Sequence, residues 1–249
     1  MKILALIPAR MGSSRFPGKP MAEILGKPMI GHVYERVSQS KLLHLTVVAT
    51  CDKEIYDYIV SIGGKAVMTS NKHERASDRC AEALLNIEDE LGLTYDIVVM
   101  VQGDEPMTYP EMIEEAVNPM LTNSNIQIVN LFSEIKDNLE FEDKNCIKVV
   151  MDLHGDALYF SREPIPTNNR ASITKRNKQV CIIPFRRDFL IKYCNLSVTP
   201  LEVAESVDMM RVLEHGFKVK MIPTSYLTFA VDTPENLLDV ELKMKGVAG

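Results

Sequence analysis

The sequence lacks several features that would assign it to a common class of protein. No apolar run approaches the roughly 20 residues needed to span a bilayer, so we do not expect an integral membrane protein. Positive charge is not in excess, because 28 Lys and Arg stand against 34 Asp and Glu, for a formal net charge of −6. Binding to nucleic-acid backbones depends on clustered Lys and Arg, so we do not expect that class either. Any polyanion must therefore be bound by a small part of the chain.

Cysteine and histidine are few and scattered. The five cysteines form no CxxC pair, and the five histidines show no HExxH or related spacing, so a structural zinc site is not expected. An odd number of unpaired cysteines, with no cleavable signal before the first apolar run, favours a reducing, cytoplasmic location. A bound metal would have to use carboxylates and phosphate oxygens, which are the ligands that Mg²⁺ prefers.

Apolar runs alternate with helical patterns along the first half of the chain. Short runs without polar alternation predict strands buried on both faces of a parallel sheet, and apolar residues at helical spacing predict helices between them. The length of 249 residues suits one α/β domain over residues 1–249, in which residues 130–190 form a smaller antiparallel sub-lobe. The predicted strands are residues 2–8, 45–50, 65–69 and 97–101, and the predicted helices are residues 29–38, 52–62 and 75–91.

The second half carries helix-start signals and weaker strand signals. Thr108 with Glu111, and Thr199 with Glu202, have the spacing of a capping box, and Thr233 precedes a proline. We therefore expect three helices to begin at these positions. The remaining predictions are strands at residues 147–151, 157–160 and 180–184, and a polar surface loop at residues 167–178.

A basic, glycine-rich loop follows the first predicted strand and reads PARMGSSRFPGKP from residue 8. Its glycines allow main-chain N–H groups to approach an anion, and Arg10, Arg15 and Lys19 supply positive charge. A triphosphate would fit such a loop. Lys19 is followed by Pro20, so this is not a Walker A loop, and no GxGxxG fingerprint is present. A basic surface turn remains the alternative.

Two aspartates stand where an apolar stretch meets a helix start. Asp104 lies in VQGDEP and Asp232 in VDTPE. Carboxylates at neighbouring strand ends can share one Mg²⁺ that also binds phosphate. For Asp232 alone, an ordinary acidic residue at a helix N-terminus is an alternative interpretation.

Four segments, in order along nearly the whole chain, resemble those of the 3-deoxy-manno-octulosonate cytidylyltransferases, also called CMP-Kdo synthetases. They are PARMGSSRFPGKP, VQGDEP, ALYFSREPIP and FAVDTPENL, which begin at residues 8, 101, 157 and 229. The resemblance implies a nucleotide-diphospho-sugar transferase-like α/β fold, with a mostly parallel mixed sheet flanked by helices and a small antiparallel insertion. It also implies a homodimer, paired through residues 130–190, that uses CTP and Mg²⁺ to join CMP to a small acidic sugar.

The resemblance also implies roles for individual residues. Lys19, Arg15 and Asp104 would be catalytic, and Asp104 and Asp232 would bind Mg²⁺. The family run HxSGTDR corresponds to residues 73–79, which lack its glycine, so a surface position for Arg79 stays open. The residues implied in binding CTP are Arg10, Gly12, Ser13, Ser14, Arg15, Lys19, Ser70, Arg79 and Gln102.

The residues expected around the acceptor depart from the family pattern. Arg162 is a candidate clamp for a carboxylate, with pairing to Glu163 or to a dimer partner as the alternative. Gln179 and Asp208 are the other candidates. The family motif HLGIYGY is QVCIIPF here, and ESLEQLR is ESVDMMR. The resemblance implies Kdo or a Kdo-like acid as acceptor. Because of the changed motifs, a different 2-keto sugar acid or a phosphonate is an alternative acceptor. A non-catalytic nucleotide-binding homologue is the alternative to an enzyme.

Overall fold

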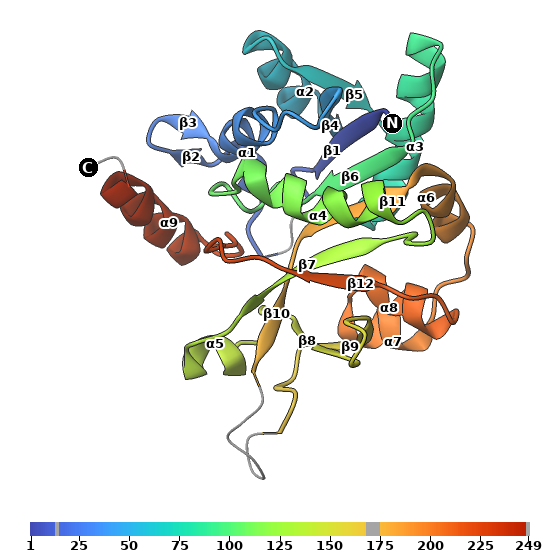
Figure 1. Cartoon of the computed structure of the whole chain (residues 1–249). Coiled ribbons are helices and arrows are strands. Elements are labelled where there is room, and N and C mark those ends of the chain that lie inside the picture. The colour runs from blue at the N-terminus through green and yellow to red at the C-terminus, as the bar shows by residue number, and fades with distance from the viewer. Residues whose placement is uncertain (13–14, 168–174, 248–249) are drawn as a thin grey trace. The chain divides into compact units, whose positions relative to one another are not determined.

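The structure is a computed structural model that describes residues 1–12, 15–167 and 175–247 (Figure 1). The chain forms two compact units. The first unit comprises Met1–Glu114 and Leu227–Gly249, and the second comprises Glu115–Tyr226.

The sheet of the first unit is built from the apolar runs that the sequence shows most clearly. Its strands lie in the order β6-β1-β4-β5 and all neighbours are parallel. Every residue of β6 is buried, as expected for a strand covered on both faces. The strands are β1 (Ile3–Ala9), β4 (Leu45–Thr50), β5 (Lys65–Met68) and β6 (Ile97–Val101).

Three helices connect these strands: α1 (Met29–Val37), α2 (Lys53–Ser61) and α3 (Ala76–Leu91). The chain runs from β1 to β4 to β5 in one direction, and α3 then returns it to the other side of β1. Right-handed connections place α1 and α2 on one face and α3 on the other. The direction of winding therefore reverses between β1 and β6, and ligand sites of α/β proteins tend to lie at such a point, beyond the carboxyl ends of the strands.

The C-terminal segment completes the first unit. Helix α9 (Pro234–Val247) and the segment before it pack on a small hairpin of β2 (Glu23–Ile24) and β3 (Lys27–Pro28), which follows the 3-10 helix η1 (Lys19–Met21). The buried residues of this cluster are Ile24, Met29, Met107, Val231, Val240 and Met244.

The sheet of the second unit has the order β12-β7-β10-β8-β9. β12 is parallel to β7, and the other neighbours are antiparallel. Its strands are β7 (Val129–Glu134), β8 (Lys148–Met151), β9 (Ala157–Ser161), β10 (Asn177–Val180) and β12 (Lys220–Pro223), and β11 (Ile182–Arg186) follows β10.

Helices α7 and α8 of the second unit are joined by a buried ion pair. Glu202 in α7 accepts two bonds from Arg211 in α8, at 2.7 Å from Nε and 2.6 Å from Nη2. Such bidentate pairs fix geometry as well as charge. The helices are α5 (Asn138–Glu142), α6 (Arg187–Cys194), α7 (Pro200–Glu205) and α8 (Asp208–Glu214), and α4 (Pro110–Thr122) carries the chain from the first unit into the second.

Two local predictions were wrong. The strand expected at residues 180–184 is two strands, β10 and β11, and β10 begins inside the expected loop. β10 lies between two antiparallel neighbours, so pairing on both sides holds its polar residues in a strand. Helix α4 begins at Pro110, because the Thr108 hydroxyl donates to the carbonyl oxygen of Glu105 at 2.8 Å instead of capping a helix.

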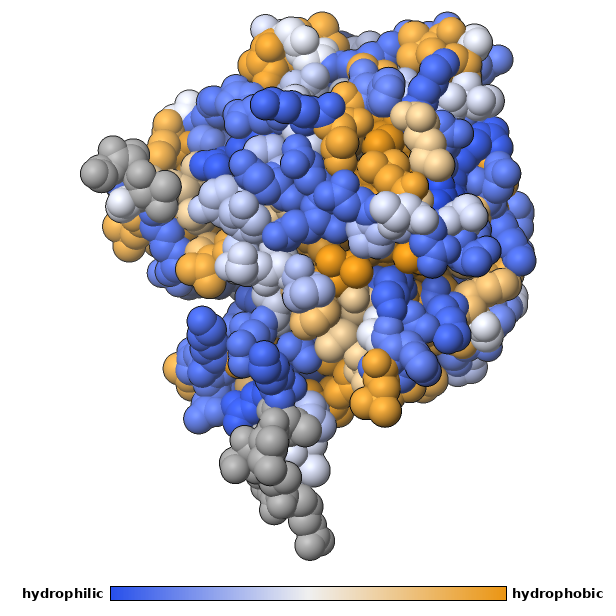
Figure 2. Space-filling model, in the orientation of Figure 1, coloured by the Kyte–Doolittle hydropathy of each residue, from blue (hydrophilic) through white to orange (hydrophobic). Residues whose placement is uncertain are grey.

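Hydrophobic residues on the face drawn in Figure 2 occur in separate areas interrupted by hydrophilic ones. Within the part of the chain that the structure describes, no helix combines the length and apolar character required to cross a membrane.

Candidate functional site

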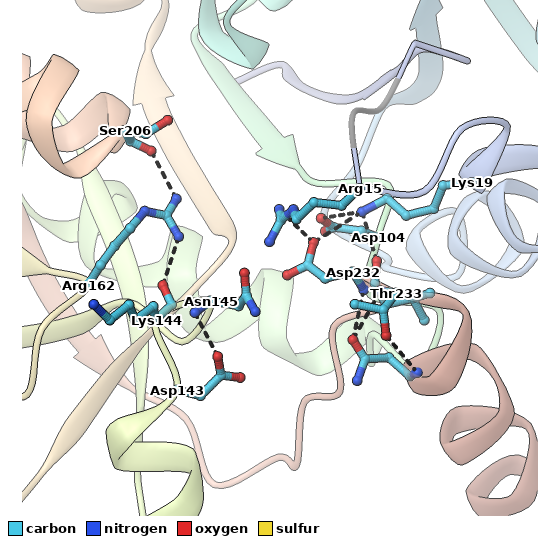
Figure 3. A network of polar contacts seen from close by, with 12 residues as sticks. Arg15, Lys19, Asp104, Asp143, Lys144, Asn145, Arg162, Ser206, Asp232 and Thr233 are labelled. Carbon is cyan, nitrogen blue, oxygen red and sulfur yellow. Dashed lines mark hydrogen bonds and ion pairs between the residues drawn. The ribbon is translucent and has the colours of Figure 1, made fainter.

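Asp104 and Asp232 contact the same ammonium group in the first unit. The Nζ of Lys19 lies 3.2 Å from Asp104 Oδ2 and 3.5 Å from Asp232 Oδ1, and it donates to the carbonyl oxygen of Val231 at 2.7 Å (Figure 3). Asp104 follows β6, Lys19 follows β1, and Asp232 precedes α9. The structure therefore brings together three residues that are far apart in the sequence, at the point where the winding reverses.

Arg15 adds a second cation to this cluster, with Nη2 2.9 Å from Asp232 Oδ1. The side chains of Lys19, Asp104 and Asp232 are 13%, 22% and 15% exposed, so water screens their charges less than at an open surface. The Thr233 hydroxyl accepts from the main-chain N–H of Asn236 at 3.3 Å and so caps α9. The carboxylate of Asp232 thus contacts cations, while Thr233 supplies the helix cap.

The donor set suits a magnesium ion better than a transition metal. The Lys19 ammonium lies between the carboxylates of Asp104 and Asp232. Carboxylates are ligands that Mg²⁺ prefers. Among the residues that the structure describes, no group of three or more His, Cys, Asp or Glu could hold a metal ion. An ion on Asp104 and Asp232 would therefore need further oxygen ligands from water or from a bound phosphate.

The loop after β1 is anchored at its base. The main-chain N–H of Met11 donates to Asp52 Oδ2 at 2.8 Å, and the N–H of Gly18 donates to the carbonyl oxygen of Met11 at 3.0 Å. Gly18 has φ of 75°, a left-handed conformation that favours glycine. Arg10 and Gly12 are exposed in this loop, and the predicted residues Ser13 and Ser14 lie outside the described part of the chain.

A cavity of about 140 Å³ lies between the carboxyl end of β1 and the start of α3. Three arginines and one carboxylate, Glu74, line it, and this excess of positive charge favours an anionic or polar ligand. Ser70 and Gln102, which were also predicted to bind nucleotide, do not line it. The lining residues are Pro8, Ala9, Arg10, His73, Glu74, Arg75, Ala76 and Arg79.

Arg79 does not lie on a solvated helix face, because it is only 3% exposed. Its guanidinium donates to Thr69 Oγ1 at 2.5 Å and to the carbonyl oxygens of Ser70 and His73 at 3.2 and 3.3 Å. Arg79 therefore both lines the cavity and holds the turn beside it.

In the second unit, Arg162 donates to three main-chain carbonyls. Its Nε lies 2.6 Å from the oxygen of Glu205. Nη1 lies 3.0 Å from that of Lys144, and Nη2 lies 3.3 Å from that of Ser206 (Figure 3). Glu163, the alternative partner suggested by the sequence, pairs instead with Lys144 at 2.9 Å. Arg162 thus joins the end of β9 to the end of α7.

Glu205 was not identified from the sequence. Its carboxylate accepts from the Tyr159 hydroxyl at 2.9 Å and from the main-chain N–H of Arg162 at 2.8 Å. Burial, and then the hydrogen bond to Glu205, raise the pKa of the Tyr159 hydroxyl. Asp208, a predicted acceptor residue, begins α8, and its carbonyl oxygen accepts from the Tyr193 hydroxyl at 3.1 Å.

Gln179 has a fixed amide orientation. The fully buried Asn130 donates both N–H groups of its amide, to the carbonyl oxygens of Leu131 at 2.8 Å and Val180 at 2.7 Å. Its Oδ1 must then be the acceptor, and Gln179 Nε2 donates to it at 2.6 Å. The structure places Arg162, Gln179 and Asp208 in one unit.

A sequence model of the family described as Cytidylyltransferase matches residues 4–222, so the chain belongs to the cytidylyltransferases. It is 43% identical to the 3-deoxy-manno-octulosonate cytidylyltransferase of Geobacter metallireducens, covering 98% of both chains, and 41% identical to that of Geotalea uraniireducens, covering 98% of this chain and 100% of the relative. Within the cytidylyltransferases, the chain is a member of the 3-deoxy-manno-octulosonate cytidylyltransferase family.

Solved structures agree with this assignment. The structure of CMP:2-keto-3-deoxy-manno-octonic acid synthetase complexed with CTP is similar, with a TM-score of 0.90 and 38% identity over 99% of both chains. The 4-diphosphocytidyl-2C-methyl-D-erythritol synthase of Anaerococcus prevotii, at 15% identity and a TM-score of 0.60 over 98% of both chains, shares the fold alone. The predicted nucleotide-diphospho-sugar transferase-like α/β fold is confirmed.

Proposed function

We propose that this chain transfers CMP from CTP to the anomeric hydroxyl of a 3-deoxy-2-ulosonic acid, Kdo or a Kdo-like acid, and releases pyrophosphate. The observation that carries the proposal is the cluster of Arg15, Lys19, Asp104 and Asp232 at the ends of neighbouring strands. Its charges match a metal-bound triphosphate, and the relatives at about 40% identity are named for this reaction.

The first unit would bind the nucleotide. Arg10, Arg15 and Lys19, with the main-chain amides around Gly12, would neutralise the triphosphate; Ser13 and Ser14 would add hydroxyl donors. The cavity of about 140 Å³ is smaller than the roughly 300 Å³ typical of ligand pockets, so it suits one part of a nucleotide. In the proposal it takes the cytosine and ribose, assisted by Ser70, Arg79 and Gln102.

Asp104 and Asp232 would hold Mg²⁺, which when bound neutralises charge that develops on the phosphate oxygens. Lys19 would then exchange its two carboxylate contacts for phosphate oxygens. Without substrate, Arg15 and Lys19 offset the charges of the two carboxylates.

The reaction is an in-line displacement at the α-phosphorus. A bond forms between the anomeric oxygen and that phosphorus, the bond from the α-phosphorus to the oxygen leading to the β-phosphate breaks, and the proton of the anomeric hydroxyl passes to solvent. Such transfers are accelerated mainly by placing the reactants and by neutralising charge, so no covalent intermediate with the protein is required. Arg15 and Lys19 would stabilise the departing pyrophosphate.

The second unit would bind the acid through Arg162, Gln179 and Asp208. Arg162 donates to three main-chain carbonyls, which hold its guanidinium in place, and its positive charge would attract the acceptor carboxylate. Because QVCIIPF replaces HLGIYGY, another 2-keto sugar acid or a phosphonate is the second candidate.

The test is pyrophosphate release by purified protein with CTP, MgCl₂ and a panel of acids, with UTP as the nucleotide control. We expect turnover with CTP and Kdo or a Kdo-like acid, and its loss when EDTA removes the metal. Turnover with none of the ulosonic acids would refute the proposed acceptor. CTP binding in calorimetry without turnover on any acid would favour a non-catalytic homologue. Light scattering of the same sample tests the predicted homodimer.

A further inference from the structure

The turn between β5 and α3, residues 69–75, is held by two charged side chains of α3. Arg79 donates to the carbonyl oxygens of Ser70 and His73, as described above. Glu82, one helical turn further on, supplies the acceptors. The last residues of this turn, His73, Glu74 and Arg75, line the cavity beside β1.

Glu82 binds the main chain at the start of this turn. The N–H of Ser70 lies 3.1 Å from its Oε1 and 2.9 Å from its Oε2, and His73 Nε2 contacts the same Oε2. Hydrogen bonds to a charged acceptor are about twice as strong as neutral ones. The Glu82 side chain is 33% exposed, so water screens these bonds only in part.

The two side chains act on complementary groups. Arg79 donates to carbonyl oxygens of the turn. Glu82 instead accepts hydrogen bonds from the main-chain N–H of Ser70 and contacts the ring nitrogen Nε2 of His73. Residues 70–73 are therefore held by two side chains of α3, and His73 belongs to the cavity wall that it forms with Glu74 and Arg75. Loss of either side chain would loosen this wall without touching the loop of residues 10–19.

We infer that Glu82 is a positioning residue for the nucleoside part of the substrate: it holds the turn that forms one wall of the cavity. The inference rests on the proposed function, in which this cavity takes the cytosine and ribose. Glu82 contacts the turn and not the cavity itself, because it is not among the lining residues. Its effect should therefore fall on ligands that carry a base and spare those that carry phosphates alone.

Two variants separate the length of the side chain from its charge. Glu82→Asp keeps the charge but withdraws the carboxylate by one carbon from the N–H of Ser70. Glu82→Gln keeps the length and one carbonyl acceptor but removes the charge. Glu90→Gln is the matched control, since Glu90 is an exposed residue of the same helix that pairs with Lys65 at 2.7 Å.

Calorimetry with CTP and with inorganic tripolyphosphate, both with MgCl₂, provides the readout. We expect Glu82→Asp to weaken CTP binding about tenfold while tripolyphosphate binds as in the unmodified protein, and Glu82→Gln to stay within about threefold for both. Unchanged CTP affinity in Glu82→Asp would overturn the inference, as would equal weakening of both ligands. Failure of the unmodified protein to bind CTP would instead refute the proposed function.

Discussion

The main-chain N–H of Val231 donates to the carbonyl oxygen of Asp104 at 2.8 Å. This bond ties the segment that precedes α9 to the end of β6. It places the carboxylate of Asp104 and that of Asp232, the residue after Val231, within reach of the same Lys19 ammonium. The acidic half of the site thus depends on one main-chain contact between residues far apart in the chain.

Replacing Asp104 or Asp232 by Asn should reduce pyrophosphate release about a hundredfold, since loss of one preorganised charge contact costs on the order of 3 kcal/mol of transition-state stabilisation. Both variants should keep their circular dichroism spectrum, because both side chains remain partly solvated. Asp89→Asn, at an exposed position of α3, should retain full activity. Near-normal rates in Asp104→Asn or Asp232→Asn would remove the assigned metal ligands.

Lys19→Met should bind Mg²⁺ more tightly than the unmodified protein when no nucleotide is present. The ammonium and the ion compete for the same carboxylates, so removing the ammonium frees both of them for the metal. A several-fold lower Kd, or a larger rise of Tm with MgCl₂, is the expected result. Pyrophosphate release should nevertheless fall, because Lys19 would no longer contact the phosphates. Equal metal affinity in the two proteins would show that Lys19 does not occupy the metal position.

Asp52→Ala should weaken binding of both CTP and tripolyphosphate by about tenfold, because the main-chain N–H of Met11 loses its anchor. Asp52→Asn retains an acceptor oxygen and should bind both ligands nearly as the unmodified protein does. Cys51→Ala, which removes only the 3.6 Å thiol contact to Asp52, is the control and should leave affinity unchanged. Titration calorimetry with each ligand checks the order, and tight binding by Asp52→Ala would contradict it.

His32 should make the protein less stable at mildly acidic pH. Burial lowers the pKa of its ring below the ordinary value of 6.5, and its Nε2 lies 2.8 Å from the carbonyl oxygen of Ile24. The unfolded chain therefore binds more protons at and below pH 6.5, so the free energy of unfolding falls as the pH drops from 6.5 toward the lower pKa of the folded state. Above that window this contribution is fully present.

Urea denaturation between pH 5 and 8 measures the effect. His32→Gln keeps an N–H donor for Ile24 but cannot titrate in this range, so its unfolding free energy should depend less on pH. His154→Gln, at an exposed position, should retain the slope of the unmodified protein. Identical slopes for His32→Gln and the unmodified protein would assign the pH dependence to other groups.

The sequence predicted the first sheet better than the second for a physical reason. β4 and β6 have the predicted bounds, because strands buried on both faces are continuous apolar runs. β7 and β10 instead carry polar side chains such as Asn130 and Gln179, and the pairing of neighbouring strands satisfies them. Such pairing between distant segments leaves no local pattern in the sequence.

Some residues of the site were likewise predictable from the sequence, and others were not. Arg15, Lys19, Asp104 and Asp232 could be proposed because charged residues at strand ends and in a glycine-rich loop form a recognisable pattern. Asp52 and Glu82 were missed, since each acts on a main-chain N–H, a group that every residue except proline carries. The position of Asp52 directly after a buried strand was the one available signal; α3 gave none for Glu82.

The segment of residues 227–233, which leads into α9, also decides when a growing polypeptide can complete the cluster of Lys19, Asp104 and Asp232. Residues 227–249 belong to the first unit but follow the whole second unit, Glu115–Tyr226, so a ribosome makes Val231, the partner of Asp104, after the second unit. Until Val231 emerges from the exit tunnel, Lys19 has one carboxylate to contact instead of two. A nascent chain that stops before Asp232 therefore lacks the paired aspartates that we propose to hold Mg²⁺, even when its first sheet has formed.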